Sequence, residues 1–235
     1  MSEKNVASVK FINSKSEKIF NLKEHALIGI SPFNSYYSEE NLKRLFAWGL
    51  ANFKKISVFI PTEISAYTLQ AVGCSEEKAK KKTRKHDKNL EHKALRALIA
   101  NNLSDDEAKN QMIFFSDLMN NRKYLEIYDI CIKLYETNED FRKGCLETSK
   151  WVLAGKGSSD FVNEEALNIA AKYFLAELPL YLNTPKIFDV SSSLIVYKDL
   201  PSIFLNKIYS GNSFFSSLVY SQQGYLAVDF GKGIL

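Results

Sequence analysis

The chain has 235 residues, of which 46% are hydrophobic, 13% aromatic and 25% charged, and its formal net charge is +4. This length and composition are typical of a globular domain and exclude a disordered chain, a coiled coil and a disulfide-stabilised mini-protein. No apolar run approaches the roughly 20 residues that a membrane span needs, and the polar N-terminus shows no secretory signal. We expect one cytoplasmic domain over residues 1–235, with residues 1–20 as an N-terminal extension.

Strand and helix signals alternate from residue 27 onwards. A β-branched run over 27–30 predicts a buried strand that ends at Ser31-Pro32, and Lys55–Ile60 predicts a second strand. Between them, Ser38 is a suitable N-cap for a helix over Glu39–Asn52. A strand, a helix and a strand in this order build a parallel sheet through a right-handed crossover. The sequence therefore predicts an α/β fold.

The later elements are read from shorter signals. Helices are predicted over 62–72, 75–100, 124–135, 140–153 and 163–178, strands over 111–115 and 194–197, and one more helix before a Gly-containing tail. Pro179 is expected to end or kink the helix before it. With no internal repeat and no linker, one domain is favoured.

Basic side chains are concentrated in the predicted helix 75–100. Between Lys78 and Arg96 lie nine Lys or Arg and only two acids, whereas the rest of the chain is mildly acidic. On a helix these side chains form a stripe about 25 Å long, from the rise of 1.5 Å per residue. The stripe indicates binding to a phosphate backbone. A solvated lysine-rich face is the alternative.

Metal and cofactor motifs are absent from the sequence. Neither a dinucleotide-binding G-x-G-x-x-G nor a P-loop occurs, and the histidines lack zinc-ligand spacing. The cysteines are too scattered for a disulfide framework. The histidines are His25, His86 and His92, and the cysteines are Cys74, Cys131 and Cys145. We expect no bound metal and reduced thiols.

Ser31 is a candidate nucleophile, because open α/β sheets bind ligands where their strands end. Its segment Gly29-Ile30-Ser31-Pro32-Phe33-Asn34 is similar to a G-x-S-x-G nucleophile elbow but lacks the second glycine. The alternative is an ordinary turn serine.

Tyr173 and Glu177 are a second candidate site, because a spacing of four places both side chains on one helix face. Its apolar surroundings are expected to raise the pKa of Glu177, as suits a general base or an amine-binding group, unless the side chain is exposed.

Taken in order, the segment 29–36, the basic helix, Tyr173-x-x-x-Glu177 and Tyr197 on a late strand resemble the cyclodipeptide synthase family. The resemblance extends from about His25 to residues 223–226. It implies a Rossmann-like domain, with a mostly parallel central sheet flanked by helices, similar to the catalytic domain of class I aminoacyl-tRNA synthetases. It also implies an aminoacyltransferase that joins two amino acids delivered on tRNA into a cyclic dipeptide, with two aminoacyl-tRNAs as partners and no cofactor.

The same resemblance implies a role for each motif. Ser31 would accept the first aminoacyl group as an ester. In the second step of this ping-pong reaction the same serine would carry a dipeptidyl ester. Gly29 and Asn34 would shape the site, Tyr173 and Glu177 would hold the amino group, and Tyr197 would position the acyl enzyme. The residues expected to bind the first tRNA are Lys78, Lys81, Lys82, Lys85, Lys88, Lys93 and Arg96.

The resemblance also implies a pocket for the first amino acid. Its candidate residues are Leu27, Val58, Ile113, Leu180 and Ile195, all aliphatic. Such a lining favours an apolar side chain such as Leu, Met or Phe, because it offers no partner to a buried charge. We expect leucine-containing cyclic dipeptides.

One position departs from the family pattern. Asn34 and Tyr197 match the subfamily that carries Asn, Tyr and His at three marker positions, but Lys198 stands where that subfamily has His and the other has Pro.

Two alternatives to a cyclodipeptide synthase remain open. An aminoacyl-tRNA synthetase fragment would need ATP-binding signatures, which are absent, and a non-catalytic tRNA- or RNA-binding protein would leave Tyr173 and Glu177 unexplained. We expect a monomer or a weak dimer.

Overall fold

A six-stranded sheet forms the centre of the protein in a computed structural model that describes residues 7–154, 163–211 and 213–230. Its strand order is β1-β6-β5-β2-β3-β4. All neighbouring strands are parallel except β1, which pairs antiparallel with β6. The strands are β1 (Ser8–Phe11), β2 (His25–Gly29), β3 (Lys55–Ile60), β4 (Met112–Phe114), β5 (Ser193–Tyr197) and β6 (Gln223–Asp229). The expected α/β fold with a mostly parallel sheet is confirmed.

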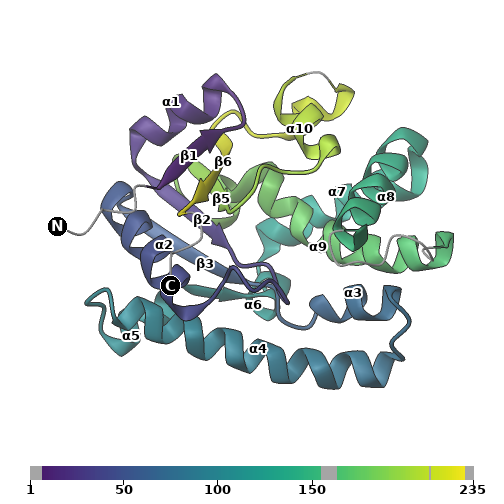
Figure 1. Cartoon of the computed structure of the whole chain (residues 1–235). Helices are drawn as coiled ribbons and strands as arrows, with labels where there is room; N and C mark the ends of the chain where they lie inside the picture. Colours follow the sequence, from purple (N-terminus) through teal and green to yellow (C-terminus); the bar gives the residue numbers. More distant parts are fainter. Residues whose placement is uncertain (1–6, 155–162, 212, 231–235) are drawn as a thin grey trace.

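Helices cover both faces of this sheet, and Figure 1 shows the long helix α4 running along the lower edge of the molecule beside α3. The helices are α1 (Ser14–Leu22), α2 (Glu39–Asn52), α3 (Ser65–Ala71), α4 (Glu76–Ile99), α5 (Asp105–Gln111), α6 (Phe115–Met119), α7 (Arg122–Thr137), α8 (Glu139–Ala154), α9 (Glu164–Phe188) and α10 (Ile203–Tyr209), followed by a 3-10 turn, η1 (Phe214–Leu218). Within the described part of the chain, no helix has both the length and the apolarity to cross a membrane.

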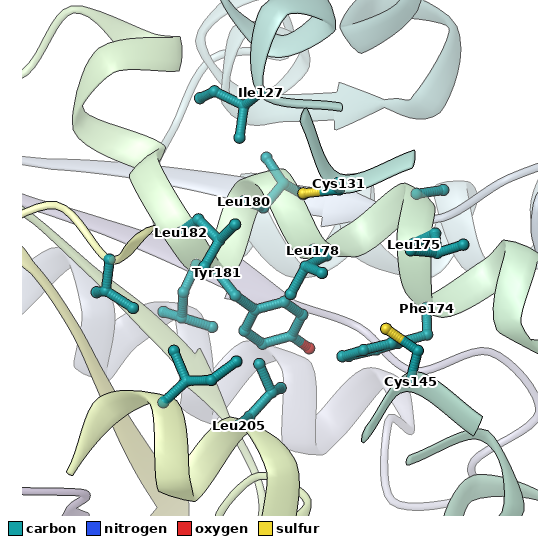
Figure 2. Close-up of a cluster of buried hydrophobic side chains, with 14 of the residues drawn as sticks. Ile127, Cys131, Cys145, Phe174, Leu175, Leu178, Leu180, Tyr181, Leu182 and Leu205 are labelled. Atoms are coloured by element: carbon teal, nitrogen blue, oxygen red, sulfur yellow. The ribbon is translucent and has the colours of Figure 1, made fainter. Parts of the chain in front are cut away.

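The side chains of the central strands point alternately into two cores, as successive strand residues must. Leu27, Phe59 and Ile195 belong to the core that α7, α8, α9 and α10 cover. Their chain neighbours Ile28 and Val58 belong to the core beneath α2 and α4. Figure 2 shows the first core, whose members include Leu180 and Phe174 of α9, Cys131 of α7 and Cys145 of α8. Both thiols are free and buried.

The first crossover follows its sequence signals closely. Helix α2 begins after Ser38, whose hydroxyl accepts a hydrogen bond from the Asn41 N–H at 3.3 Å, and it ends at the predicted Asn52. Strand β3 spans the predicted residues 55–60. Because the Ser31 loop connects the end of β2 to the start of α2, it lies at the carboxyl end of the sheet.

Four parts of the chain differ from the sequence analysis. An N-terminal extension was expected over residues 1–20, but β1 and α1 lie within residues 8–22, and the expected tail forms β6, which pairs with β1. The helix expected to end or kink at Pro179 runs through this proline to a kink at Asn183, after which a second helical segment reaches Phe188. The segment around Pro179 is almost completely buried, so packing outweighs the lost backbone hydrogen bond. Helices α5 and α6 were not predicted.

Candidate active site

The candidate site lies where β2 and β5 adjoin in the sheet, which is the point at which the strand order reverses. Ligands of open α/β sheets bind beside such a point, at the carboxyl ends of the strands. Ser31 follows β2, and Tyr197 is the last residue of β5. A cavity of about 670 Å³ opens there, and both residues line it together with Asn34, Tyr173 and Glu177. Five of the six predicted catalytic residues thus border one cavity.

The carboxylate of Glu177 is the polar centre of this cavity. The side chain is only 6% exposed, although it lies on α9 among apolar residues. The Tyr173 hydroxyl donates a hydrogen bond to Oε1 at 2.7 Å, and the Tyr197 hydroxyl reaches the same oxygen at 3.5 Å. The Tyr181 hydroxyl donates to Oε2 at 3.3 Å. Three phenols therefore hold one buried carboxylate, as a buried charge requires.

The phenols around Glu177 keep their protons. Burial, followed by the charge of Glu177, raises the pKa of Tyr173 and Tyr197 well above the usual value for tyrosine. Burial also raises the pKa of Tyr181, with smaller contributions from Tyr197 and Glu177. All three hydroxyls consequently remain hydrogen-bond donors at neutral pH, and the arrangement offers a carboxylate that can bind or deprotonate an amine.

Tyrosine rings form one wall of the site. The rings of Tyr181, Tyr197 and Tyr225 stack pairwise, with centroids 6.1–6.3 Å apart. The Tyr197 ring also lies against the backbone of Gly29, where a Cβ would come within 2.0 Å of its Cζ. Glycine at position 29 is therefore required for this placement of the ring.

The loop that carries Ser31 is a compact turn. The Asn34 side-chain oxygen accepts from the Tyr36 N–H at 3.0 Å, and the Asn34 carbonyl accepts from the Tyr37 N–H at 3.2 Å. The phenol of Tyr37 is 3% exposed and lines the same cavity as Ser31. Burial raises the pKa of Tyr37. Ser31 and the protonated phenol of Tyr37 thus border the same cavity, on either side of the Asn34 turn.

A small recess of about 10 Å³ adjoins the cavity, because Glu177, Tyr181 and Tyr197 line both. Leu27, Leu180 and Ile195 line it, as expected, and Phe59 completes the wall. Val58, predicted for this pocket, belongs instead to the core on the opposite face of the sheet. Strand β3 is buried on both faces, so its sequence did not reveal which side chain points to the site. The remaining pocket candidate, Ile113, packs against the core on the site's side but does not line the recess.

Helix α4 presents most of its basic side chains to solvent. Its buried face consists of Ala79, Thr83, Leu90, Ala94, Ala97 and Leu98. The predicted tRNA-binding residues Lys78, Lys81, Lys82, Lys85, Lys88 and Arg96 are exposed and Lys93 is half-buried. Arg96 forms an ion pair with Glu39 of α2 at 2.7 Å. Near the end of the helix, Lys93 and Arg96 share a cavity of about 220 Å³ with Ser31 and Asn34. The basic stripe therefore leads to the loop of the candidate nucleophile.

Lys198, the residue that departs from the family pattern, also lies at the site. Its ammonium group stands over the Tyr36 ring, 4.9 Å from the centroid, and the residue lines the large cavity. A cation in this position adds positive charge at the mouth of the site. Among the described residues, no group of three or more His, Cys, Asp or Glu side chains could hold a metal ion.

Three further tyrosines of the site escaped the sequence analysis. Tyr181 follows Glu177 by four residues on the same helix, so the spacing used for Tyr173 could have identified it. Tyr37 and Tyr225 are placed at the cavity by the Ser31 turn and by strand β6. No local signal in the sequence marks either of them.

Comparison with known proteins agrees with this geometry. The family described as cyclodipeptide synthase matches residues 8–229, which is nearly the whole chain. The chain belongs to the cyclodipeptide synthase family. It is therefore an enzyme of the transferase type.

Two relatives of this cyclodipeptide synthase align over almost their full length. A cyclo(L-leucyl-L-leucyl) synthase from Bacillus subtilis is 34% identical over 94% of this chain and 90% of its own length. One of the same name from Staphylococcus haemolyticus is 32% identical over 93% and 92%. The solved structure of a Staphylococcus haemolyticus cyclodipeptide synthase has a TM-score of 0.85 at 29% identity, covering 95% of this chain and 99% of that one.

A Mycobacterium tuberculosis structure, described as demonstrating that cyclodipeptide synthetases are related to type I tRNA-synthetases, has a TM-score of 0.82 at 27% identity. It covers 97% of this chain and 94% of that chain. The expected likeness of the fold to class I synthetases is thereby confirmed.

Proposed function

We propose that this cyclodipeptide synthase uses two aminoacyl-tRNAs and works by a ping-pong mechanism through esters on Ser31. The proposal depends on one observation above all: a single cavity brings Ser31 together with the Glu177 carboxylate and its tyrosine hydroxyls. A nucleophile beside a group that can bind an amine suits a reaction in which the acyl group carries a free amino group.

Three transfers complete the reaction without a cofactor. The Ser31 oxygen attacks the ester carbonyl of the first aminoacyl-tRNA, and the ribose hydroxyl of the tRNA leaves with the serine proton. The amine of the Ser31 ester then attacks the second aminoacyl-tRNA, which forms the peptide bond and releases the second tRNA. Finally the terminal amine attacks the Ser31 ester, closes the ring and regenerates the hydroxyl. Because both substrates are activated esters, the demands on a general base are modest.

Glu177 would bind the amino group of the acyl moiety as an ammonium ion and accept its proton before each attack. The Tyr173 hydroxyl, 2.7 Å from Oε1, would fix the carboxylate for this purpose. Tyr197 would position the acyl chain, because its ring lies between Gly29 and the stack of Tyr181 and Tyr225. Each role concerns an atom that borders the same cavity.

Helix α4 would bind the phosphate backbone of the tRNA. The exposed lysines supply the charge that such binding needs. Their stripe ends beside Ser31, because Lys93 and Arg96 border the same small cavity as the serine. A tRNA bound along α4 would therefore bring its acceptor end to the nucleophile. The relation of the fold to tRNA-synthetases supports this proposal.

The product is proposed to contain leucine. The recess beside Glu177 is lined by Leu27, Phe59, Leu180 and Ile195, and it offers no polar partner other than the carboxylate and the phenols at its mouth. Apolar recesses of this kind select apolar side chains. The Bacillus and Staphylococcus relatives, named as leucyl-leucyl synthases, support the same choice.

Mass spectrometry of the medium from bacteria that express the protein tests the proposal. The wild type should release a cyclic dipeptide with leucine, and Ser31→Ala should release none while it still binds tRNA. A product that persists in Ser31→Ala would contradict the ester mechanism. Product formation by purified protein from free amino acids and ATP, without tRNA, would contradict the proposed substrates.

A further inference from the structure

His86 of α4 contacts the Ser31 loop through two interactions that the reaction scheme leaves unused. The Phe33 backbone N–H donates a hydrogen bond to His86 Nε2 at 3.0 Å. The two rings also stack, with centroids 4.2 Å apart and planes inclined by 27°. One side chain therefore ties the helix of the basic stripe to the residue that lies two positions after the candidate nucleophile.

The loop needs such support, because Phe33 has an unfavourable backbone conformation. Its φ of 58° lies in the left-handed region, which residues other than glycine seldom adopt. Pro32 precedes it, and the chain turns there from β2 towards the Asn34 turn. A strained residue next to a reactive group persists only where its surroundings hold it. The stacking and the hydrogen bond from His86 supply that constraint.

We propose that His86 is a positioning residue for Ser31, whose neutral imidazole holds the loop in the conformation that presents the hydroxyl to the cavity. This inference rests on the proposed role of Ser31 as the nucleophile. The hydrogen bond requires Nε2 to be unprotonated, so the ring proton lies on Nδ1. Protonation would convert the acceptor into a donor that faces another N–H, and the contact would break.

Other titratable groups lie near His86, and their titration could also change the pH dependence of the acyl transfer. The experiment must therefore distinguish their effect from that of His86. Tyr37 of the loop and His92, Lys93 and Arg96 of α4 border the same small cavity, and Glu39 of α2 pairs with Arg96. On the neighbouring side, burial and the charge of Glu63, which precedes α3, raise the pKa of Asp87 to about 7. Substitutions confined to position 86 leave all these groups in place.

Two variants of His86 form a matched pair. His86→Gln keeps a hydrogen-bond acceptor at the position of Nε2 but has no titration, whereas His86→Phe keeps a ring to stack on Phe33 but offers no acceptor. The rate of the first acyl transfer to Ser31, measured in a single turnover with labelled leucyl-tRNA, is compared between pH 5.5 and 8. Ser31→Ala provides the background, and the affinity for uncharged tRNA reports on the integrity of α4.

We expect His86→Phe to slow the acyl transfer about 10- to 100-fold at pH 8, and by a smaller factor at acidic pH to the extent that the wild-type imidazole is protonated there, with tRNA affinity within about twofold of wild type. His86→Gln should stay within about threefold of wild type at pH 8 and should lose the part of the acid-side decline that protonation of the imidazole causes. A wild-type rate in His86→Phe, or an unchanged pH profile in His86→Gln, would overturn the inference.

Two other outcomes are distinguishable from these. A wild-type protein that turns over without an ester on Ser31 would overturn the proposed mechanism, and with it the reason for positioning Ser31. Should His86→Phe fail to fold, the pH comparison between wild type and His86→Gln decides alone, since a merely structural histidine would not change the shape of that profile.

Discussion

The Tyr197 ring lies so close to Gly29 that a Cβ added at position 29 would be 2.0 Å from its Cζ and 2.3 Å from its hydroxyl oxygen. The glycine ends β2 and the tyrosine ends the neighbouring strand β5. Since the same hydroxyl reaches Glu177, any side chain at position 29 would displace a phenol from the carboxylate. The backbone of β2 at Gly29 therefore determines where the Tyr197 hydroxyl lies relative to the Glu177 carboxylate.

Gly29→Ala should therefore reduce cyclic dipeptide formation at least 100-fold, because the Tyr197 ring must move out of the cavity wall. The measurement is product yield per folded protein. Gly49→Ala on α2 is the matched control, since its added Cβ would meet the flexible end of Ile28 at 3.0 Å, in the core on the other face of the sheet. It should keep the activity. Equal losses in both variants would show that Gly29 acts only through stability.

Tyr173→Phe removes the shortest hydrogen bond to Glu177. A hydrogen bond to a charged group contributes about 1.5–3 kcal/mol, so the turnover rate should fall about 10- to 100-fold. Tyr135→Phe is the control, because that hydroxyl donates to the Asn168 side chain at 2.8 Å, between α7 and α9 and outside the cavity lining. It should cost about 1 kcal/mol of stability and leave turnover intact. Turnover that is equally high in both variants would argue against a role for Tyr173.

Leu180→Ala enlarges the recess, whereas Val58→Ala creates a cavity of smaller size in the opposite core. Both side chains are buried, and both losses should lower the stability, Leu180→Ala by about 2–5 kcal/mol. Only Leu180→Ala should change the ratio of products, towards larger first residues such as phenylalanine, as measured by mass spectrometry. A change of ratio in Val58→Ala would restore Val58 to the pocket.

That control also shows where sequence reasoning ended. The β-branched runs and the Ser38 cap predicted β2, α2 and β3, since those signals are local. The choice between Val58 and Phe59 depended on which face of β3 meets α9, and a strand without alternating polar residues carries no such information.

Long-range contacts were equally out of reach. Strand β1 is four residues long and pairs with β6 more than 200 residues away, so neither strand had a local signal strong enough for assignment. Tyr181 was accessible by its spacing from Glu177, but the helix was expected to end at Pro179. The sequence predicted the site residues that belong to local motifs. It did not predict those that only long-range contacts bring to the site.

Replacing Lys81, Lys82, Lys85 and Lys88 by Ala should weaken tRNA binding and reduce its dependence on salt, because fewer counterions are released on binding. The measurement is the dissociation constant between about 50 and 200 mM salt. Replacing Lys10, Lys18, Lys133 and Lys143, which are exposed on β1, α1, α7 and α8, removes the same charge and should leave the slope unchanged. Equal slopes in both variants would contradict a tRNA site on α4.

His25 should make the stability depend on pH. Its ring lies between the Ser193 hydroxyl, 2.7 Å from Nδ1, and the Ser57 hydroxyl, 3.1 Å from Nε2. Burial, and to a smaller extent the charge of Lys55, lowers the pKa of His25 to about 3. The unfolded chain, with its ordinary pKa near 6.5, therefore binds the proton first as the pH falls.

This contribution is fully present above pH 6.5 and is lost as the pH falls from there towards 3. Between pH 7 and 5.5 it amounts to about 1.3 kcal/mol of unfolding free energy. Urea titrations at the two pH values should show that His25→Gln lacks this component, whatever its stability at pH 7. His92→Gln, at an exposed position of α4, should retain it. A pH dependence in His25→Gln as steep as in the wild type would mean that the buried imidazole does not drive the acid sensitivity of the fold.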